Sequence, residues 1–321
     1  MLHLRVVSPT ALTDEVEAII ANEPTAIGLV VLRGVATRPA GDVVEADIPR
    51  EVANDLVDRL RATGVHHDGT IHIDTVATWL SRSGFDAELE APGSSADAVV
   101  WSEVAQRSYD ESELNWTYLT FMTLATVLAA IAIVLDSQIL VIGAMVLGPE
   151  FGPVAALGVA LVLRRWVLLA LATRTLILGF VAAIAITAVL ALVVRLLGWV
   201  TVDELRSPHP NVAFIASPDR WSFIVALVAG AAGVISVTSS KLGGLTGVFI
   251  SVTTVPAAGN IALGTAFGLS ATVWGSAEQL VVNLIGMALA GWLTLLFQQA
   301  VWSRIRIRRA HSLLRRRRRM M

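Results

Sequence analysis

The segment DSQILVIGAMVLGPEFGPVAALG, residues 136–158, is apolar over the length of a membrane helix, but Gly and Pro interrupt it halfway. A spanning helix needs about 20 mostly apolar residues. Pro149 and Pro153 each lack the backbone N–H that a helix uses, and the proline ring clashes with the preceding turn. In hydrocarbon, a backbone group freed in this way needs a partner from protein or water. The segment therefore predicts a broken helix that is buried in protein or lines a wet cavity.

A second segment, GGLTGVFISVTTVPAAGNIALG at residues 243–264, is interrupted in the same way by Pro256. Each interrupted segment is the middle one of three apolar stretches, one in each half of the membrane part. Because three spans are an odd number, the second half enters the membrane from the opposite side. This pattern indicates an inverted repeat with two broken helices, which in secondary transporters frames a binding site near the midplane.

Composition supports a membrane protein. Of the 321 residues, 55% are hydrophobic and 16% are charged, whereas soluble domains carry about 25% charged residues. We expect an α-helical polytopic protein with about six spans, at residues 117–135, 137–163, 175–196, 221–239, 243–265 and 273–301. Residues 164–174 are expected to lie along the interface before the third span. The absence of cysteine excludes disulfides and thiolate metal sites.

The distribution of charge orients these spans. Residues 1–113 hold 8 Arg against 20 Asp and Glu, whereas residues 114–321 hold 16 Lys and Arg against 6 acids. Arg164, Lys241 and the Arg-rich tail 304–321 all fall on one side of the predicted membrane. By the positive-inside rule this side is cytoplasmic, so both termini are expected inside a bacterial plasma membrane. The tail then binds anionic lipid headgroups of the bilayer and not nucleic acid.

Residues 1–80 alternate short strands and helices. We expect strands at 2–7, 26–34, 42–49 and 69–74 and helices at 13–23 and 51–64, with Thr13 as the N-cap of the first helix. The order βαββαβ is that of an α+β ferredoxin-like domain, here cytosolic. Residues 81–115 are expected to form a linker, over 81–98, and an amphipathic helix. The transmembrane domain follows at 116–303.

Glu150 is the sharpest single candidate for a functional residue. A carboxylate near the middle of a span is costly, and by default it indicates function; here it would accept a proton or a cation. The alternative, a solvated group in a water-filled vestibule, stays open. The full set of candidate substrate- or ion-binding residues is Glu150, Gly148, Pro149, Gly152, Pro153, Thr253, Thr254, Pro256, Asn260 and Asn283.

No motif points to catalysis or to a cofactor. The chain has no Walker A loop, HExxH or G-x-S-x-G motif, so we expect no enzyme and no cofactor. His66, His67 and His72 cluster in the N-terminal domain, but their spacing is a weak metal signal and favours a surface turn. We therefore expect no metal site.

Four segments resemble a known family. They are DSQILVIGAMVLGPEFGPV (136–154), AGAAGVISV (229–237), LGGLTGVFISVTTVPAAGNIALG (242–264) and WGSAEQLVVNLIGM (274–287). The chain resembles the bacterial and archaeal membrane proteins known as domain of unknown function 389. The resemblance implies a multi-pass protein with a cytosolic front domain, and brings no activity. Gly148 and Glu150 differ from the residues that this family usually has at these positions, and so do Thr253, Thr254 and Val255.

Two function classes follow. The first is a transporter or ion-conducting protein with a small-solute or ion site between the two broken helices. The alternative is a membrane-anchored sensor or assembly protein, whose cytosolic domain binds a ligand or partner while the spans anchor it. In both, a homo-oligomer is expected, because ferredoxin-like sandwiches often pair through their sheets.

Overall fold

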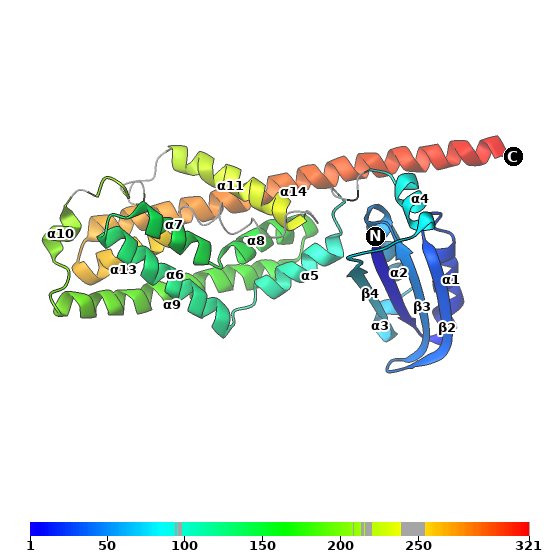
Figure 1. The fold of residues 1–321 in the computed structure, drawn as a ribbon, viewed down its shortest axis with the longest axis horizontal. Coiled ribbons are helices and arrows are strands. Elements are labelled where there is room, and N and C mark those ends of the chain that lie inside the picture. Colours follow the sequence, from blue (N-terminus) through cyan, green and yellow to red (C-terminus); the bar gives the residue numbers. More distant parts are fainter. Residues whose placement is uncertain are drawn as a thin grey trace. The chain divides into compact units, whose positions relative to one another are not determined.

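The computed structural model describes residues 1–93, 95, 98–207, 209–212, 215, 220–238 and 254–320, with side chains as far as Val301. The chain divides into two compact units. The N-terminal unit comprises Met1–Glu103 with Val301–Met321, and the helical unit comprises Val104–Ala300. Figure 1 labels the elements of both.

A four-stranded antiparallel sheet forms the centre of the N-terminal unit. Its strands are β1 (Leu2–Ser8), β2 (Ile27–Thr37), β3 (Ala40–Ile48) and β4 (Thr70–Thr75), in the order β2-β3-β1-β4. Helix α1 (Thr13–Ala21) follows β1 after a short 3-10 turn, Thr10–Leu12. Helix α2 (Arg50–Ala62) follows β3. The predicted order of strands and helices is present, with a short helix α3 (Val65–Asp68) added before β4.

One face of this sheet carries the core. Because side chains alternate along a strand, Leu2, Leu4 and Val6 of β1 point to the same face and are all buried. They pack with alternate residues of β3 and with the apolar stripes of the two helices. These partners are Val44, Ala46 and Ile48 of β3, Val16 and Ile20 of α1, and Val52, Leu56 and Leu60 of α2.

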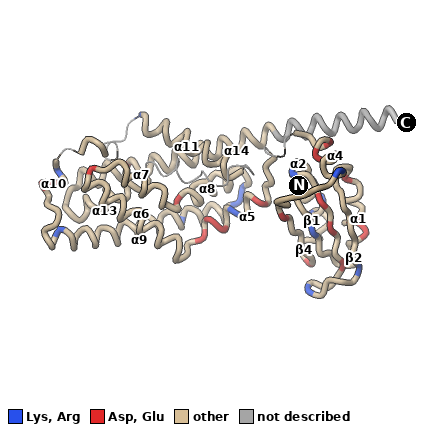
Figure 2. Tube along the Cα trace, viewed as in Figure 1, with Lys and Arg blue, Asp and Glu red and all other residues tan. Residues whose placement is uncertain are grey.

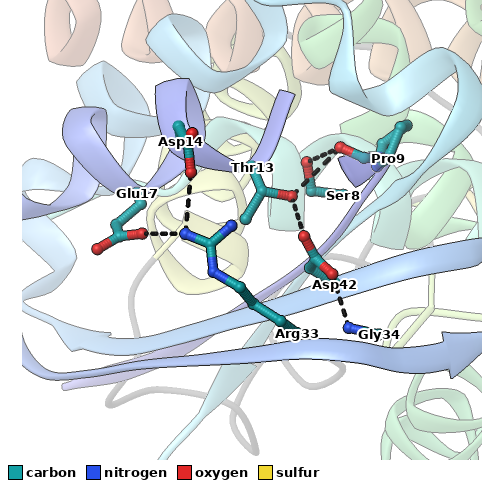
Figure 3. A network of polar contacts seen from close by, with 8 residues as sticks. All are labelled: Ser8, Pro9, Thr13, Asp14, Glu17, Arg33, Gly34 and Asp42. Carbon is teal, nitrogen blue, oxygen red and sulfur yellow. Dashed lines mark hydrogen bonds and ion pairs between the residues drawn. The ribbon is translucent and has the colours of Figure 1, made fainter. Parts of the chain in front are cut away.

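A polar network fixes the start of α1 against β2 and β3 (Figure 3). The prediction that Thr13 caps α1 is wrong, because Thr13 is the first residue of the helix and Leu12 occupies the cap. The Thr13 hydroxyl instead donates to Asp42 Oδ2 at 2.7 Å, and the Gly34 N–H donates to Asp42 Oδ1 at 2.7 Å. These hydrogen bonds, that of Thr13 first, hold the pKa of Asp42 below its usual range.

The segment expected to be a linker contains a helix, α4 (Arg82–Glu90). The Ser81 hydroxyl caps it by accepting a hydrogen bond from the Gly84 N–H at 3.2 Å. Gly84 is buried against Trp79, whose ring leaves no room for a Cβ there. The small residues that suggested a linker thus form a helix that packs closely.

The described part of the helical unit is built of helices. They are α5 (Trp101–Glu111, which begins in the N-terminal unit), α6 (Trp116–Val134), α7 (Gln138–Leu147), α8 (Phe151–Leu163), α9 (Trp166–Leu196), α10 (Val202–Arg206), α11 (Arg220–Thr238), α13 (Val255–Phe267) and α14 (Ser270–Met320, which continues beyond this unit). In Figure 2, charged residues gather on α5, whereas α6 and α7 are almost free of them. The predicted amphipathic helix before the first span is therefore present as α5.

Four helices of the described residues are long and apolar enough to cross a membrane: α6, α9, α11 and α14 as far as Val301. They become five if α7 and α8, which are bent against each other, count as one span. Their outward surfaces are apolar, and Trp116, Trp166, Trp221 and Trp274 are exposed near helix starts. These features are typical of a multi-pass membrane protein. Residues 243–253 of the fifth predicted span lie outside the described residues.

Helix α9 differs from the expectation. Residues 166–174 do not form a separate segment, because α9 runs without interruption over 31 residues from Trp166 to Leu196. Arg165 immediately precedes it, and Arg174 lies within it. The single helix keeps its backbone hydrogen bonds internal along its whole length, which membrane surroundings favour.

Glycines let neighbouring helices approach closely in the helical unit. A Cβ on Gly230 of α11 would lie 2.5 Å from the Met287 carbonyl oxygen of α14. A Cβ on Gly158 of α8 would lie 3.1 Å from the Trp292 backbone nitrogen, also in α14. Small residues at helix contacts are typical of membrane bundles. Gly230 and Gly158 thus serve close helix packing.

Candidate functional site

The interruption in the first segment separates α7 from α8. Gly148, Pro149 and Glu150 lie between the two helices, whose axes are bent by 54°. This geometry is that of one bent span or of a re-entrant loop. Pro153 is the third residue of α8, where a helix leaves its N–H groups without an internal partner. Pro149 therefore coincides with the break, and Pro153 fits the first turn that follows it.

The described part of the second segment, from Thr254 onward, also begins a helix beside a proline. Helix α13 begins at Val255, Pro256 occupies its first turn, and Thr254 holds the N-cap position. Proline favours this end of a helix because it needs no N–H there. Thr253, the remaining candidate of this segment, lies outside the described residues.

These two helix starts meet at Glu150 and Thr254. The Thr254 hydroxyl donates a hydrogen bond of 2.6 Å to Glu150 Oε1. The two residues are 1% and 0% exposed, and each is the N-cap of its helix. The N-terminal end of a helix carries a partial positive charge. The starts of α8 and α13 therefore both stabilise negative charge on the Glu150 carboxylate.

A second polar contact lies further along α13. Asn260 Nδ2 donates to Ser276 Oγ of α14 at 2.9 Å, and both side chains are buried. Gln279 and Asn283 follow Ser276 at helical spacing on α14, and both are also buried. Within the described part of the chain, the Gln279 side-chain amide has no hydrogen-bond partner.

The axial positions connect the two contacts. Thr254 precedes Asn260 by six residues, or about 9 Å of helix, and Asn283 follows Ser276 by seven, or about 10 Å. Because α13 and α14 follow each other through the turn at Gly268 and pair at Asn260 and Ser276, Asn283 falls near the level of Thr254. Ser276, Gln279 and Asn283 thus form a buried polar stripe on α14, which extends from the Asn260 contact toward the level of Thr254.

A pocket of about 380 Å³ opens beside the break. Its lining includes Gly148, Pro149, Phe151 and Gly152 from the break, residues 107–115 around the end of α5, and Tyr118 of α6. Glu111 packs so closely on Gly152 that a Cβ there would lie 2.9 Å from Glu111 Oε2.

The structure brings some of the predicted site residues together and not others. Gly148, Pro149 and Gly152 line the pocket, Glu150 and Thr254 form the buried pair, and Asn260 contacts Ser276. Pro153 and Pro256 are buried within the first turns of their helices. Sequence reasoning missed Tyr118, Glu111 and Ser276. Tyr118 carried the clearest signal, as one of only two tyrosines in the chain.

A match to a known protein family covers the region that holds the site. Residues 145–289 match the family described as "Domain of unknown function (DUF389)". The resemblance seen in the sequence is confirmed over these residues. The DUF389 match begins in α7 and ends in α14, so it includes both the break and α13.

One curated relative is an uncharacterised protein of Methanocaldococcus jannaschii, 25% identical over 171 residues. The match covers 53% of this chain, and the chain spans about half (49%) of the relative's length. No solved structure matches the chain. Neither the DUF389 match nor the relative attaches an activity to this chain.

Proposed function

We propose that this protein is a membrane transporter or ion-conducting protein, with a small-solute or ion site between its two interrupted helices. The observation that carries the proposal is the buried hydrogen bond between Glu150 and Thr254, at the point where α8 and α13 both begin. Ionisable residues inside membrane segments mark ion or substrate pathways by default. Glu150 is the acceptor for the proton or cation in this proposal.

The proposal includes an arrangement of the whole chain. The interrupted segments are two broken spans of a six-span inverted repeat, both termini are cytoplasmic, and the membrane is the bacterial plasma membrane. The N-terminal unit is a ferredoxin-like regulatory or assembly module, and the protein is a homo-oligomer without enzymatic activity. Pairs of interrupted segments at corresponding positions in two halves support this arrangement.

A flux assay tests the proposal. Purified protein in liposomes that contain a pH-sensitive dye is challenged with a panel of cations, anions and small organic acids. We expect saturable flux for at least one member of the panel, and its loss in Glu150→Gln, which keeps the volume and removes the charge.

Asp136→Asn is the matched control. Asp136 is also an acid of the helical unit, but its carboxylate accepts hydrogen bonds from Asn211 in an exposed connection. Flux through the Asp136→Asn protein should equal flux through the wild type. If folded, inserted wild-type protein carries no member of the panel, transport is wrong and the sensor or assembly function takes its place.

A further inference from the structure

More acidic than basic side chains line the pocket beside the α7–α8 break. Asp110, Glu111 and Glu113 contribute three carboxylates, and Arg107 contributes one guanidinium. Arg107 Nε pairs with Glu111 Oε1 at 2.7 Å, which leaves the other two acids uncompensated within the lining. Walls with an excess of one sign of charge concentrate ions of the opposite sign. The lining therefore attracts cations and repels anions.

Tyr118 adds a buried hydroxyl to the wall of the pocket. Tyr118 lines the pocket, yet its side chain is 6% exposed, and its hydroxyl has no hydrogen-bond partner among the described residues. Its ring packs against Gly179 of α9, where a Cβ would lie 2.6 Å from it. The ring is thus held in place with its hydroxyl unsatisfied. Buried polar groups of this kind are normally satisfied by ordered water.

The pocket and the Glu150 site meet along the chain at the break. Pro149 and Phe151, on either side of Glu150, both line the pocket, whereas the Glu150 side chain is buried and bonded to Thr254. An ion that enters the pocket therefore arrives within one residue of the buried carboxylate. A change at the break that turns Glu150 outward would place its charge in the pocket.

We propose that this pocket is the aqueous, cation-selecting entrance to the Glu150–Thr254 site, and that the cargo is a monovalent cation, the proton included. The inference rests on the proposed transport function and specifies its substrate class. Glu150 supplies a single negative charge and Thr254 places a neutral oxygen beside it, which matches a charge of +1. Among the described residues, no group of three His, Asp or Glu side chains could hold a metal ion, so the lining attracts cations without chelating them.

Cysteine accessibility tests the entrance directly, because the full-length protein contains no cysteine and gives no background. Tyr118→Cys places a thiol at the inner end of the pocket, and Thr117→Cys places one within its lining. Leu124→Cys, on the exposed apolar surface of α6, is the control. Each variant in liposomes is treated with a methanethiosulfonate reagent that carries either a trimethylammonium or a sulfonate group. The reaction rate with each reagent is divided by the rate at which the same reagent reacts with a free small thiol.

We expect the cationic reagent to react about tenfold faster than the anionic one at position 118, after this correction. In Asp110→Asn/Glu113→Gln the ratio should fall to near one, and Leu124→Cys should react with neither reagent. Two results would contradict the proposed entrance. One is a ratio of cationic to anionic reaction rates near one in protein that keeps Asp110 and Glu113, and the other is no reaction at positions 117 and 118.

Flux through the same liposomes separates this inference from the proposed function. If position 118 reacts selectively and its modification blocks cation flux, both are supported. Selective reaction in protein that carries no ion contradicts transport alone. Flux of an anion or a neutral solute that survives modification contradicts the inferred entrance and cargo while it leaves transport standing.

Discussion

The Thr254 hydroxyl donates a 2.6 Å hydrogen bond to the Glu150 carboxylate, although 104 residues of chain separate the two. Both side chains are buried, and each precedes a 13-residue helix, α8 or α13. The bond therefore joins the two interrupted segments at their helix starts. Its loss would leave a buried carboxylate with one hydrogen bond fewer.

Thr254→Val should destabilise the protein by about 1.5–3 kcal/mol, because it replaces a hydroxyl that donates to a charged group with a methyl group. Thr254→Ser keeps the hydroxyl and should retain most of this stability. Thermal unfolding in detergent, followed by intrinsic fluorescence, measures the difference. Equal midpoints for the Val and Ser variants would show that the bond contributes nothing.

Gly230→Ala should also destabilise the helical unit, by about 1–3 kcal/mol, because the new methyl group would meet the Met287 backbone. Gly143→Ala in α7 is the matched control: its nearest neighbour is Leu128 Cδ2 at 3.8 Å, so it should be neutral or slightly stabilising. The same unfolding assay compares the two. If Gly143→Ala proves the more harmful, the close contact of α11 with α14 is wrong.

Asp42→Asn should weaken the N-terminal unit at neutral pH and have little effect in strong acid. The folded-state pKa of Asp42 is lowered by Thr13 and by the Gly34 N–H. Such a group adds stability above its unfolded pKa and loses it as pH falls through its folded pKa. Hydrogen exchange of β3 amides in the full-length protein, measured from pH 7 downward, should show the variant and wild type converging. A gap that stays constant with pH would contradict this role.

Glu51→Gln should have the opposite effect. Burial raises the pKa of Glu51 in the first turn of α2, so its charged form costs stability at pH 7. A group with a raised pKa contributes its stability at low pH and loses it as pH rises through the folded pKa. Glutamine removes this loss, and exchange of α2 amides should slow at pH 7 but not at pH 4. Faster exchange at pH 7 would be the contrary result.

Local rules predicted the breaks, since proline withdraws its N–H whatever the surroundings. The one expected at Pro149 lies between α7 and α8, whereas beside Pro256 the described residues show a helix start at Val255. The same rules nominated both Glu150 and Thr254. They did not predict that these two residues bond to each other, because that contact depends on tertiary packing across 104 residues. Thr13 shows the same limit. Its sequence context is that of an N-cap, but Asp42, brought near by β3, takes its hydroxyl.

Composition was the weaker guide. The Gly- and Ser-containing stretch at 82–90 forms α4, because Gly84 gains a close contact with Trp79 that composition does not encode. The expectation that residues 164–174 lie apart from the third span is not met, because α9 is continuous from Trp166. Charged residues near a helix end do not interrupt it, since long side chains reach the interface from within a helix.

Ion flux in liposomes decides whether Glu150 forms the site, with wild type, Glu150→Gln and Asp136→Asn compared at equal reconstitution. We expect saturable cation flux in the wild type and in Asp136→Asn, and its loss in Glu150→Gln. Flux that is the same in all three proteins would contradict a site built on Glu150.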